Sequence, residues 1–228
     1  MAIKIALAGN PNCGKTTMFN ALTGANQYVG NWPGVTVEKK EGRLKGKRGK
    51  GEDIIVTDLP GIYSMSPYTL EEVVSRDYVL KENPDVIIDL VDATNIERNL
   101  YLTTQLIETG VPVVIALNMA DLLEKRGIKI DVKRLSMLLD CPIIETSALK
   151  GEGLDKLIDE AIKTAKKSSV DLPKEIFSKE MEEAVSEVKK VLPESITEDK
   201  KRWYAVKFLE NDSKVVESIT LPASAASI

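Results

Sequence analysis

The sequence of 228 residues contains no histidine, two cysteines and few aromatic residues, which make up 5% of the chain. Without histidine there is no Ser-His-Asp or Cys-His nucleophilic pair, no imidazole general base and no imidazole ligand for a transition metal. Cys13 and Cys141 do not form a CxxC motif, so they predict neither a disulfide framework nor a four-cysteine zinc site. Any catalysis must therefore use carboxylates, lysine, backbone dipoles or a hard metal ion.

Long hydrophobic runs are also missing. The best apolar run, Val111 to Leu117, has the length of a strand, whereas a membrane-spanning helix needs about 18 to 20 apolar residues. The N-terminal residues lack the basic, apolar and small-residue segments of a secretory signal. With 43% hydrophobic and 29% charged residues, the composition excludes a disordered chain. We therefore expect a soluble, cytosolic polypeptide.

An excess of positive charge is absent as well. The net charge is −4 at pH 7, which argues against a general nucleic-acid-binding face. The densest basic cluster is GKRGKG at residues 46–51, and we expect it at the exposed tip of a β-hairpin. Such a tip is either a solvated turn or a patch that binds phosphate or lipid headgroups.

Short β-branched runs alternate with helical periods up to about residue 168, which predicts an α/β fold with a mainly parallel sheet. The six expected strands are Ile3–Ala8, Val37–Leu44, Asp53–Asp58, Asp85–Val91, Val111–Leu117 and Pro142–Glu145. The expected helices are Lys15–Thr23, Leu70–Lys81, Ile96–Thr109, Val132–Leu139 and Leu154–Lys166.

The composition changes between Ser168 and Pro173, where we expect a short linker. Apolar residues at near-helical spacing then predict helices at Glu175–Leu192, Lys200–Leu209 and Ser213–Ile219. The last eight residues, LPASAASI, have no periodicity, and we expect them to be frayed or cut from a longer chain.

The strongest motif follows the first expected strand and opens the first helix. It matches the phosphate-loop pattern GxxxxGK[ST] and reads Gly9-Asn10-Pro11-Asn12-Cys13-Gly14-Lys15-Thr16, followed by Thr17. The glycines let the backbone wrap around a phosphate group, and the helix N-terminus supplies positive potential. Lys15 is then placed to reach the outer phosphates, and Thr16 to bind Mg²⁺.

Three weaker motifs follow later strands. Asp58-Leu59-Pro60-Gly61 can hold the metal through the carboxylate and water, and meet the terminal phosphate through the Gly61 N–H. Asn118-Met119-Ala120-Asp121 can read guanine, because a carboxylate accepts two N–H bonds from its edge, and adenine lacks that donor pair. Ser147-Ala148-Leu149 can donate a backbone N–H to the guanine oxygen. Open α/β sheets bind ligands at the carboxyl ends of their strands, so the ordered set predicts one nucleotide site.

Together these motifs resemble those of the Ras-like, translation-factor-related GTPases. The segment YVGNWPGVTVEKKEG, residues 28–42, is similar to switch I of FeoB, the prokaryotic ferrous iron transporters, and GNPNCGKTT, DLPGIYS, NMAD and TSALKGEGL match that family as well. The resemblance covers residues 3–165. It implies a Ras-like G domain with a six-stranded, mainly parallel sheet flanked by helices at residues 1–168, and an all-helical domain, incomplete here, at residues 169–228.

The resemblance also implies cofactors and partners. These are GTP or GDP, Mg²⁺ bound through Thr16, Thr36 and Asp58, and a membrane-embedded iron-permease domain of a longer protein, with small accessory proteins as further partners. The chain would then work at the cytoplasmic face of the cell membrane. Thr36 would bind Mg²⁺ only beside GTP, which makes switch I an order–disorder element. Trp32 and Tyr28 in the same loop fit either a hydrophobic lid or a partner contact.

Three residues depart from the Ras-like pattern. Ile62 stands where Ras-like GTPases place the glutamine that orients the attacking water, so intrinsic hydrolysis should be slow. Asn12 stands where K⁺-activated GTPases, FeoB among them, place a potassium ligand; it fits that role or a turn cap. Met119 replaces the lysine of NKxD, which predicts weaker packing on the base.

We expect a GTPase in which Lys15, Asn12, Gly61 and Thr36 act on the phosphates. Two alternatives are a K⁺-dependent GTPase of tRNA modification or ribosome assembly, and a nucleotide-sensing module with negligible turnover. The acidic charge and the switch I segment speak against the first alternative, and phosphate release in KCl discriminates the second. Asn118 and Asp121 disfavour ATP. Cys13 and Cys141 are better interpreted as packing residues than as iron ligands.

Overall fold

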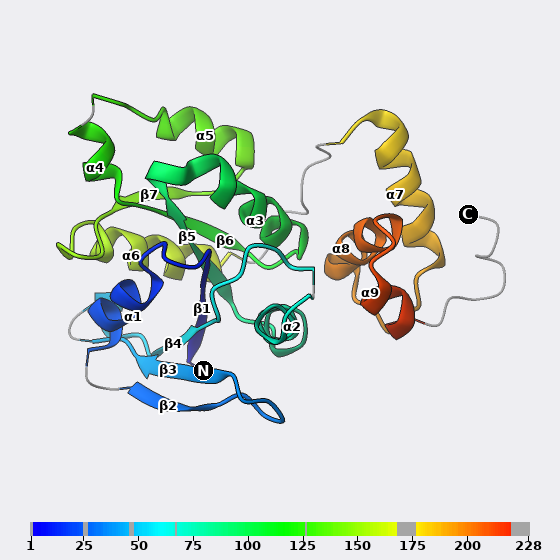
Figure 1. The fold of residues 1–228 in the computed structure, drawn as a ribbon, viewed down its shortest axis with the longest axis horizontal. Helices are drawn as coiled ribbons and strands as arrows, with labels where there is room; N and C mark the ends of the chain where they lie inside the picture. Colours follow the sequence, from blue (N-terminus) through cyan, green and yellow to red (C-terminus); the bar gives the residue numbers. More distant parts are fainter. Residues whose placement is uncertain are drawn as a thin grey trace.

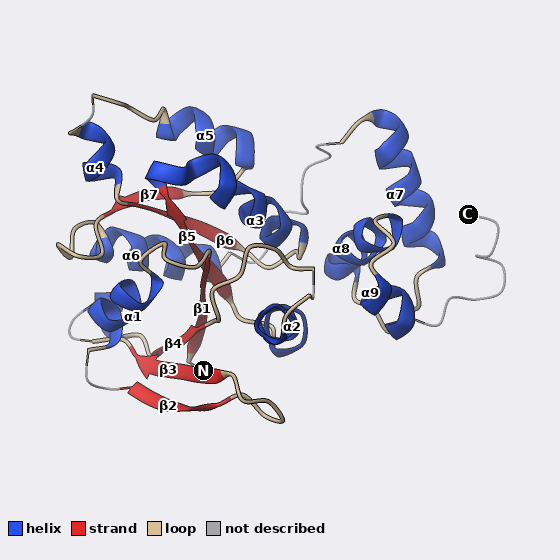
Figure 2. Ribbon diagram, viewed as in Figure 1, coloured by secondary structure: helices blue, strands red, loops and turns tan. Residues whose placement is uncertain are grey.

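The computed structural model describes residues 2–24, 27–45, 48–66, 68–125, 127–167 and 177–219. A seven-stranded sheet with helices on both faces forms the larger part, and the helices α7 to α9 lie beside it (Figure 1). Figure 2 shows that every strand drawn belongs to the larger part. We refer to these as the sheet part and the helical part.

The sheet has the strand order β2-β3-β4-β1-β5-β6-β7. Strands β4, β1, β5, β6 and β7 run parallel, whereas β2, β3 and β4 pair antiparallel. The strands are β1 (Ile3–Gly9), β2 (Gln27–Asn31), β3 (Glu38–Arg43), β4 (Ile54–Asp58), β5 (Val86–Asp92), β6 (Val113–Asn118) and β7 (Ile143–Thr146).

The eight predicted helices are present in the predicted order, and the short helix α4 is an addition that was not predicted. The helices are α1 (Lys15–Thr23), α2 (Leu70–Asp77), α3 (Ile96–Glu108), α4 (Ala120–Glu124), α5 (Val132–Leu139), α6 (Leu154–Ala165), α7 (Lys179–Val191), α8 (Glu198–Leu209) and α9 (Ser213–Ser218). Short 3₁₀ turns lie at Arg48–Gly51 and Ala93–Asn95, and a π-helical turn at Tyr78–Glu82 continues α2. None of the helices in the described residues has the length and hydropathy of a membrane span.

The α/β class is confirmed, but the predicted strand number of six was wrong. The seventh strand, β2, pairs with β3 at the edge of the sheet, where Tyr28 is 66% and Val29 53% exposed. Backbone pairing and polar contacts hold this strand, among them the hydrogen bond from the Gln27 amide to the Gly24 carbonyl at 2.7 Å. No buried apolar pattern therefore predicts it. The hairpin β3–β4 is present. Residues 46–47 at its tip, the whole expected linker at 168–173 and the terminal LPASAASI lie outside the described residues.

Two apolar layers enclose the sheet, as a parallel sheet requires. On one face, strand residues pack against α2, α3 and α5; on the other face, they pack against α1 and α6. The second layer includes the fully buried Met18, Phe19 and Leu22 of α1. Helix α1, which begins at the phosphate loop, is therefore fixed to the sheet by its own apolar face.

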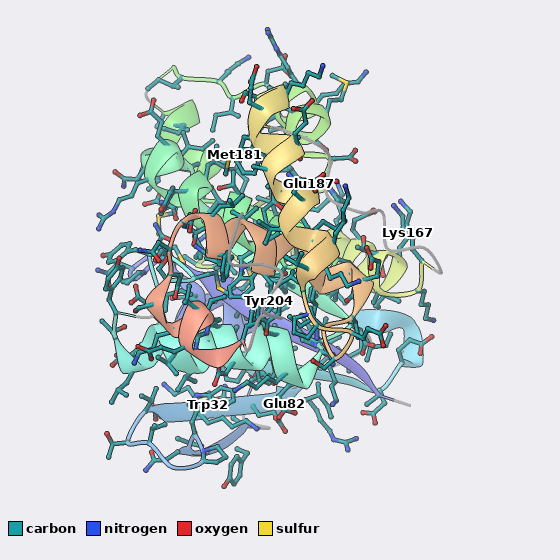
Figure 3. The ribbon with its side chains drawn as sticks, turned by 90° about the vertical axis from the view of Figure 1, so that its right-hand side faces the viewer. Trp32, Glu82, Lys167, Met181, Glu187 and Tyr204 are labelled. Carbon is teal, nitrogen blue, oxygen red and sulfur yellow. The ribbon has the colours of Figure 1, made fainter. Side chains whose placement is uncertain are left out.

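The helical part has its own apolar cluster, which includes Val185 and Val188 of α7 and Ala205 of α8. In Figure 3, Met181 and Glu187 mark α7, and Tyr204 lies on α8. The contact with the sheet part is both apolar and polar. Leu80 packs against Trp203 of α8 and Val215 of α9, and the buried Arg202 guanidinium of α8 binds Glu108 of α3 at 2.6 Å. Its other side binds Glu182 of α7 at 2.6 Å, so one cation joins three helices.

The central strand β5 buries a carboxylate, Asp89, which accepts a hydrogen bond of 2.6 Å from the Thr103 hydroxyl. Burial raises the pKa of Asp89 to about 6, and the Thr103 hydrogen bond opposes this rise. Because the folded state binds the proton more tightly than the unfolded state, ionisation costs stability progressively as the pH rises from about 4 to 6. The full cost is present above pH 6 and absent below the unfolded pKa.

We therefore expect Asp89→Asn to stabilise the protein at pH 8 by about 1 to 3 kcal/mol, and to have little effect at pH 4. The amide oxygen of asparagine can still accept from Thr103. Urea unfolding at the two pH values measures the difference, and Glu97→Gln, at an exposed position of α3, serves as the control. Equal stability of Asp89→Asn and wild type at pH 8 would contradict this prediction.

Candidate nucleotide-binding site

The phosphate loop connects β1 to α1, as predicted. Gly9 and Gly14 have φ values of 150° and 94°, and a Cβ on Gly14 would lie 2.5 Å from Asn118 Nδ2. In the part of the chain that the structure describes, no side chain caps the N-terminus of α1, so its first N–H groups stay available for an anion. Asn12 also has a positive φ of 67° and is exposed. Positions 9 and 14 require glycine for two reasons: their positive φ values are strained for other residues, and a Cβ at either position would clash with neighbouring atoms.

Lys15 and Asp58 form a buried ion pair inside the site. Lys15 Nζ lies 2.6 Å from Asp58 Oδ1, with side-chain exposures of 11% and 7%. Burial raises the pKa of Asp58, and the charge of Lys15 opposes this rise. Lys15, proposed to bind phosphate, and Asp58, proposed to bind metal, therefore neutralise each other's charge. In a complex with phosphate and metal, Lys15 would bind the phosphate and Asp58 the metal.

Trp32 anchors switch I, because its ring packs edge-on against the ring of Tyr78, with 5.4 Å between the ring centroids. Trp32 is 8% exposed and belongs to the core cluster, whereas Tyr28 is exposed. Trp32 therefore packs in the core in this structure, and its exposure leaves little surface for a partner contact. Thr36 lies in the exposed turn beyond Trp32 and forms no hydrogen bond with the phosphate loop among the described residues.

The loop that follows β4, which contains Gly61 and Ile62, contacts the phosphate loop. The Ile62 N–H donates to the Gly9 carbonyl at 3.3 Å. A Cβ on Gly61 would lie only 3.2 Å from the backbone of Pro11. The Ile62 side chain is 3% exposed and packs in the core, so it offers no group to an attacking water.

At the base-binding end, Asn118 connects two loops. Its Nδ2 donates to the Cys13 carbonyl at 2.9 Å, and its Oδ1 accepts from the Ala148 N–H at 3.0 Å. Asn118 is buried and both of its polar atoms are engaged, so it holds the loops together. A backbone N–H of the Ser147–Leu149 motif was proposed for the guanine oxygen; here the Ala148 N–H binds Asn118 and the Ser147 N–H donates to the Glu152 carbonyl at 3.1 Å. Ser147 is buried, whereas Leu149 is 89% exposed.

Asp121 of α4 forms an ion pair with Lys150, whose Nζ lies 2.7 Å from Asp121 Oδ2. The hydrogen bond from Lys150 lowers the pKa of Asp121. The sequence interpretation missed Lys150, although it stands directly after the Ser147–Leu149 motif. Met119 has a φ of 63°, and its Cε would lie 3.6 Å from a Cβ on Gly14, so the thioether lies beside the phosphate loop.

Both cysteines are packing residues. Cys13 and Cys141 are free and buried, and burial raises the pKa of each thiol to about 12. A buried neutral thiol is a poor metal ligand. Among the described residues, no cluster of three or more cysteine, aspartate or glutamate side chains is arranged to hold a metal ion. The hydroxyl and carboxylate oxygens of Thr16, Thr36 and Asp58 are instead the donor types that Mg²⁺ prefers.

Comparison with known proteins identifies the family. The family model "Ferrous iron transport protein B" matches residues 3–161, and the model "FeoB cytosolic helical domain" matches residues 177–228. The chain belongs to the FeoB family. The Fe(2+) transporter FeoB of Shigella flexneri is 41% identical over 214 residues, which are 92% of this chain and 27% of that protein. A FeoA/FeoB fusion protein of Porphyromonas gingivalis is 51% identical over 161 residues, 70% of this chain and 19% of that protein.

Solved FeoB structures share the fold. A mutant of S. thermophilus NFeoB bound to mGDP has a TM-score of 0.91 and 50% identity, and covers 98% of this chain and 84% of its own. NFeoB from S. thermophilus bound to GDP·AlF4⁻ and K⁺ has a TM-score of 0.85 and 51% identity, with 97% and 84% covered. The chain spans about a quarter of the length of the curated relatives that cover most of it.

Proposed function

We propose that this chain binds and hydrolyses GTP with Mg²⁺. The observation that carries the proposal is the convergence of the four motifs at the carboxyl ends of β1, β4, β6 and β7, with Lys15 and Asp58 paired at 2.6 Å in their midst. The solved FeoB neighbours bound to GDP, GMPPNP or GDP·AlF4⁻ support it.

The phosphate groups would be held by the backbone of residues 9–14, by the first turn of α1 (Lys15, Thr16 and Thr17) and by the Gly61 N–H. Thr16, Thr36 and Asp58 would hold Mg²⁺, which neutralises phosphate charge when bound. Asp121 would read the guanine edge, with Met119 packed on the base and residues 147–149 beside its oxygen. Asn118 keeps this end attached to the phosphate loop through the Cys13 carbonyl.

We further propose that K⁺ activates the reaction through Asn12. The missing glutamine leaves the site without a side chain that orients water, since Ile62 is buried in the core. A cation beside the phosphates would supply charge stabilisation in its place. The exposed Asn12 amide on the phosphate loop offers an oxygen for it, and the K⁺-bound FeoB neighbour supports this assignment.

For the longer protein, we propose that GTP state is relayed to a membrane-embedded iron-permease part, at the cytoplasmic face of the membrane. The names of the relatives as Fe(2+) transporters and their greater length support this. The fusion of FeoA to a FeoB supports accessory proteins as partners. We propose that residues 1–168 form the G domain and that residues 169–228 belong to the helical domain.

Phosphate release under multiple turnover tests the proposed function. We expect release from GTP in KCl with Mg²⁺, and none above background from ATP under the same conditions. Loss of release in Lys15→Ala would assign it to this site rather than to a contaminant. Binding of GTP without any release in KCl would leave a nucleotide-sensing module in place of an enzyme, and release from ATP as fast as from GTP would overturn the base assignment.

A further inference from the structure

Helix α5 has apolar side chains on two opposite faces. Val132, Leu135 and Leu139 face inward and pack against the core cluster. Met137 and Leu138 lie on the other side and are 62% and 68% exposed. The outer face of a surface helix is normally polar. Figure 1 places α5 at the outer margin of the sheet part, with none of the described helices or strands over this face.

Two cations share this outer face. Lys133 precedes Met137 by four residues and Arg134 precedes Leu138 by four, so all four side chains line the same stripe of the helix. Lys133 and Arg134 are exposed and form no side-chain ion pair within the described part of the chain. Asp131, at the N-terminus of α5, is occupied as its cap and accepts from the Arg134 N–H at 2.9 Å. We call Lys133, Arg134, Met137 and Leu138 the α5 patch.

We propose that the α5 patch docks on a bilayer that contains anionic phospholipid. Basic side chains are attracted to an anionic leaflet, and apolar side chains beside them insert at the headgroup boundary. The two cations of the patch lie beside two exposed apolar side chains in a chain of net charge −4, so its chemistry differs from that of the basic cluster at residues 46–51, which has no apolar residue. The proposal rests on the proposed attachment to a membrane-embedded part, which would hold the patch near the bilayer.

The size of the patch favours a lipid surface over a protein partner. A stable protein interface needs about 1,000 Å² or more of buried area, and two apolar side chains with two cations supply only a fraction of it. A weak membrane contact is sufficient when a tether keeps its local concentration high. Helix α4, which carries Asp121, precedes α5 by one loop, so docking would bring the base-binding end of the site close to the membrane.

Vesicle flotation of the 228-residue chain tests the proposal. We expect binding to vesicles in which about one third of the phosphatidylcholine is replaced by phosphatidylglycerol, and at least about threefold less binding to pure phosphatidylcholine. Met137→Ser with Leu138→Ser, and separately Lys133→Glu with Arg134→Glu, should each lower binding to the anionic vesicles at least about threefold.

Helix α7 offers a control with the same change of charge. Lys179 and Lys190 have side chains that are 86% and 63% exposed, and Lys179→Glu with Lys190→Glu should leave vesicle binding close to wild type. Circular dichroism and GDP binding of each variant establish that it is folded. Because vesicle binding is measured without turnover, a chain that fails to hydrolyse GTP can still pass this test.

The proposal is overturned by any of three results. These are equal binding to neutral and anionic vesicles, no binding to either, and folded α5 variants that bind as the wild type does. Loss of binding in the α7 control to the same extent as in the Lys133/Arg134 variant would also overturn it, because net charge rather than the α5 patch would then govern attachment.

Discussion

GTP hydrolysis should run at least about tenfold faster in K⁺ than in Na⁺, and Asn12→Ala should lose most of this stimulation. A stabiliser of charge that develops in the transition state acts mainly on kcat, and losing one such group typically costs about 10²-fold. Asn12 is exposed on the phosphate loop, so its side chain can be removed with little effect on the fold.

The measurement is steady-state phosphate release at equal ionic strength in KCl or NaCl. Since Asn12 has a φ of 67°, Asn12→Gly is the matched control for backbone strain: it removes the amide and keeps the conformation accessible. Both variants should bind GDP as the wild type does. Equal wild-type rates in the two salts would show that Asn12 serves only as a turn residue. A partner protein would then have to supply the catalytic group that replaces the missing glutamine.

Most of the sheet could be predicted because its strands are apolar on both faces. Val113–Asn118 and Val86–Asp92 are buried throughout or nearly so, and such runs flanked by turn residues have few other interpretations. The edge strand β2 could not be predicted, since Gln27–Asn31 is held by backbone pairing and buries no side chain fully. The π-helical turn at Tyr78–Glu82 was not predicted either; the sequence analysis placed its first four residues in the helix expected at Leu70–Lys81.

The candidate site, like the sheet, could be predicted only in part. Motifs set by backbone needs, such as Gly9 and Gly14, were predicted because only glycine fits their φ and their contacts. Contacts between distant side chains could not be predicted. The tie from Asn118 to Cys13 spans 105 positions in sequence, and the pairing of Lys150 with Asp121 depends on how two loops meet. Sequence motifs predict the kind of ligand, whereas the structure shows which protein groups contact each motif residue.

Asp121→Asn should lower GTP affinity at least about tenfold and raise affinity for xanthosine triphosphate. The wild-type carboxylate can accept from both the ring N–H and the amino group of guanine, whereas an amide would set a donor against a donor. Each charge-assisted hydrogen bond lost in this way costs about 1.5 to 3 kcal/mol. Xanthine carries an oxygen where guanine carries the amino group, so the amide would gain an acceptor.

A variant at Lys150 distinguishes the loss of base recognition from the loss of the ion pair, because the Lys150 ammonium lies 2.7 Å from the Asp121 carboxylate. Guanine must share or replace this partner, so Lys150→Gln should preserve the preference for guanine over xanthine even if the absolute affinity shifts. Titration of both variants with GTP and xanthosine triphosphate provides the comparison. If Asp121→Asn keeps wild-type guanine affinity, Asp121 serves only as the counter-ion of Lys150, and the base must be read by the loop at residues 147–149.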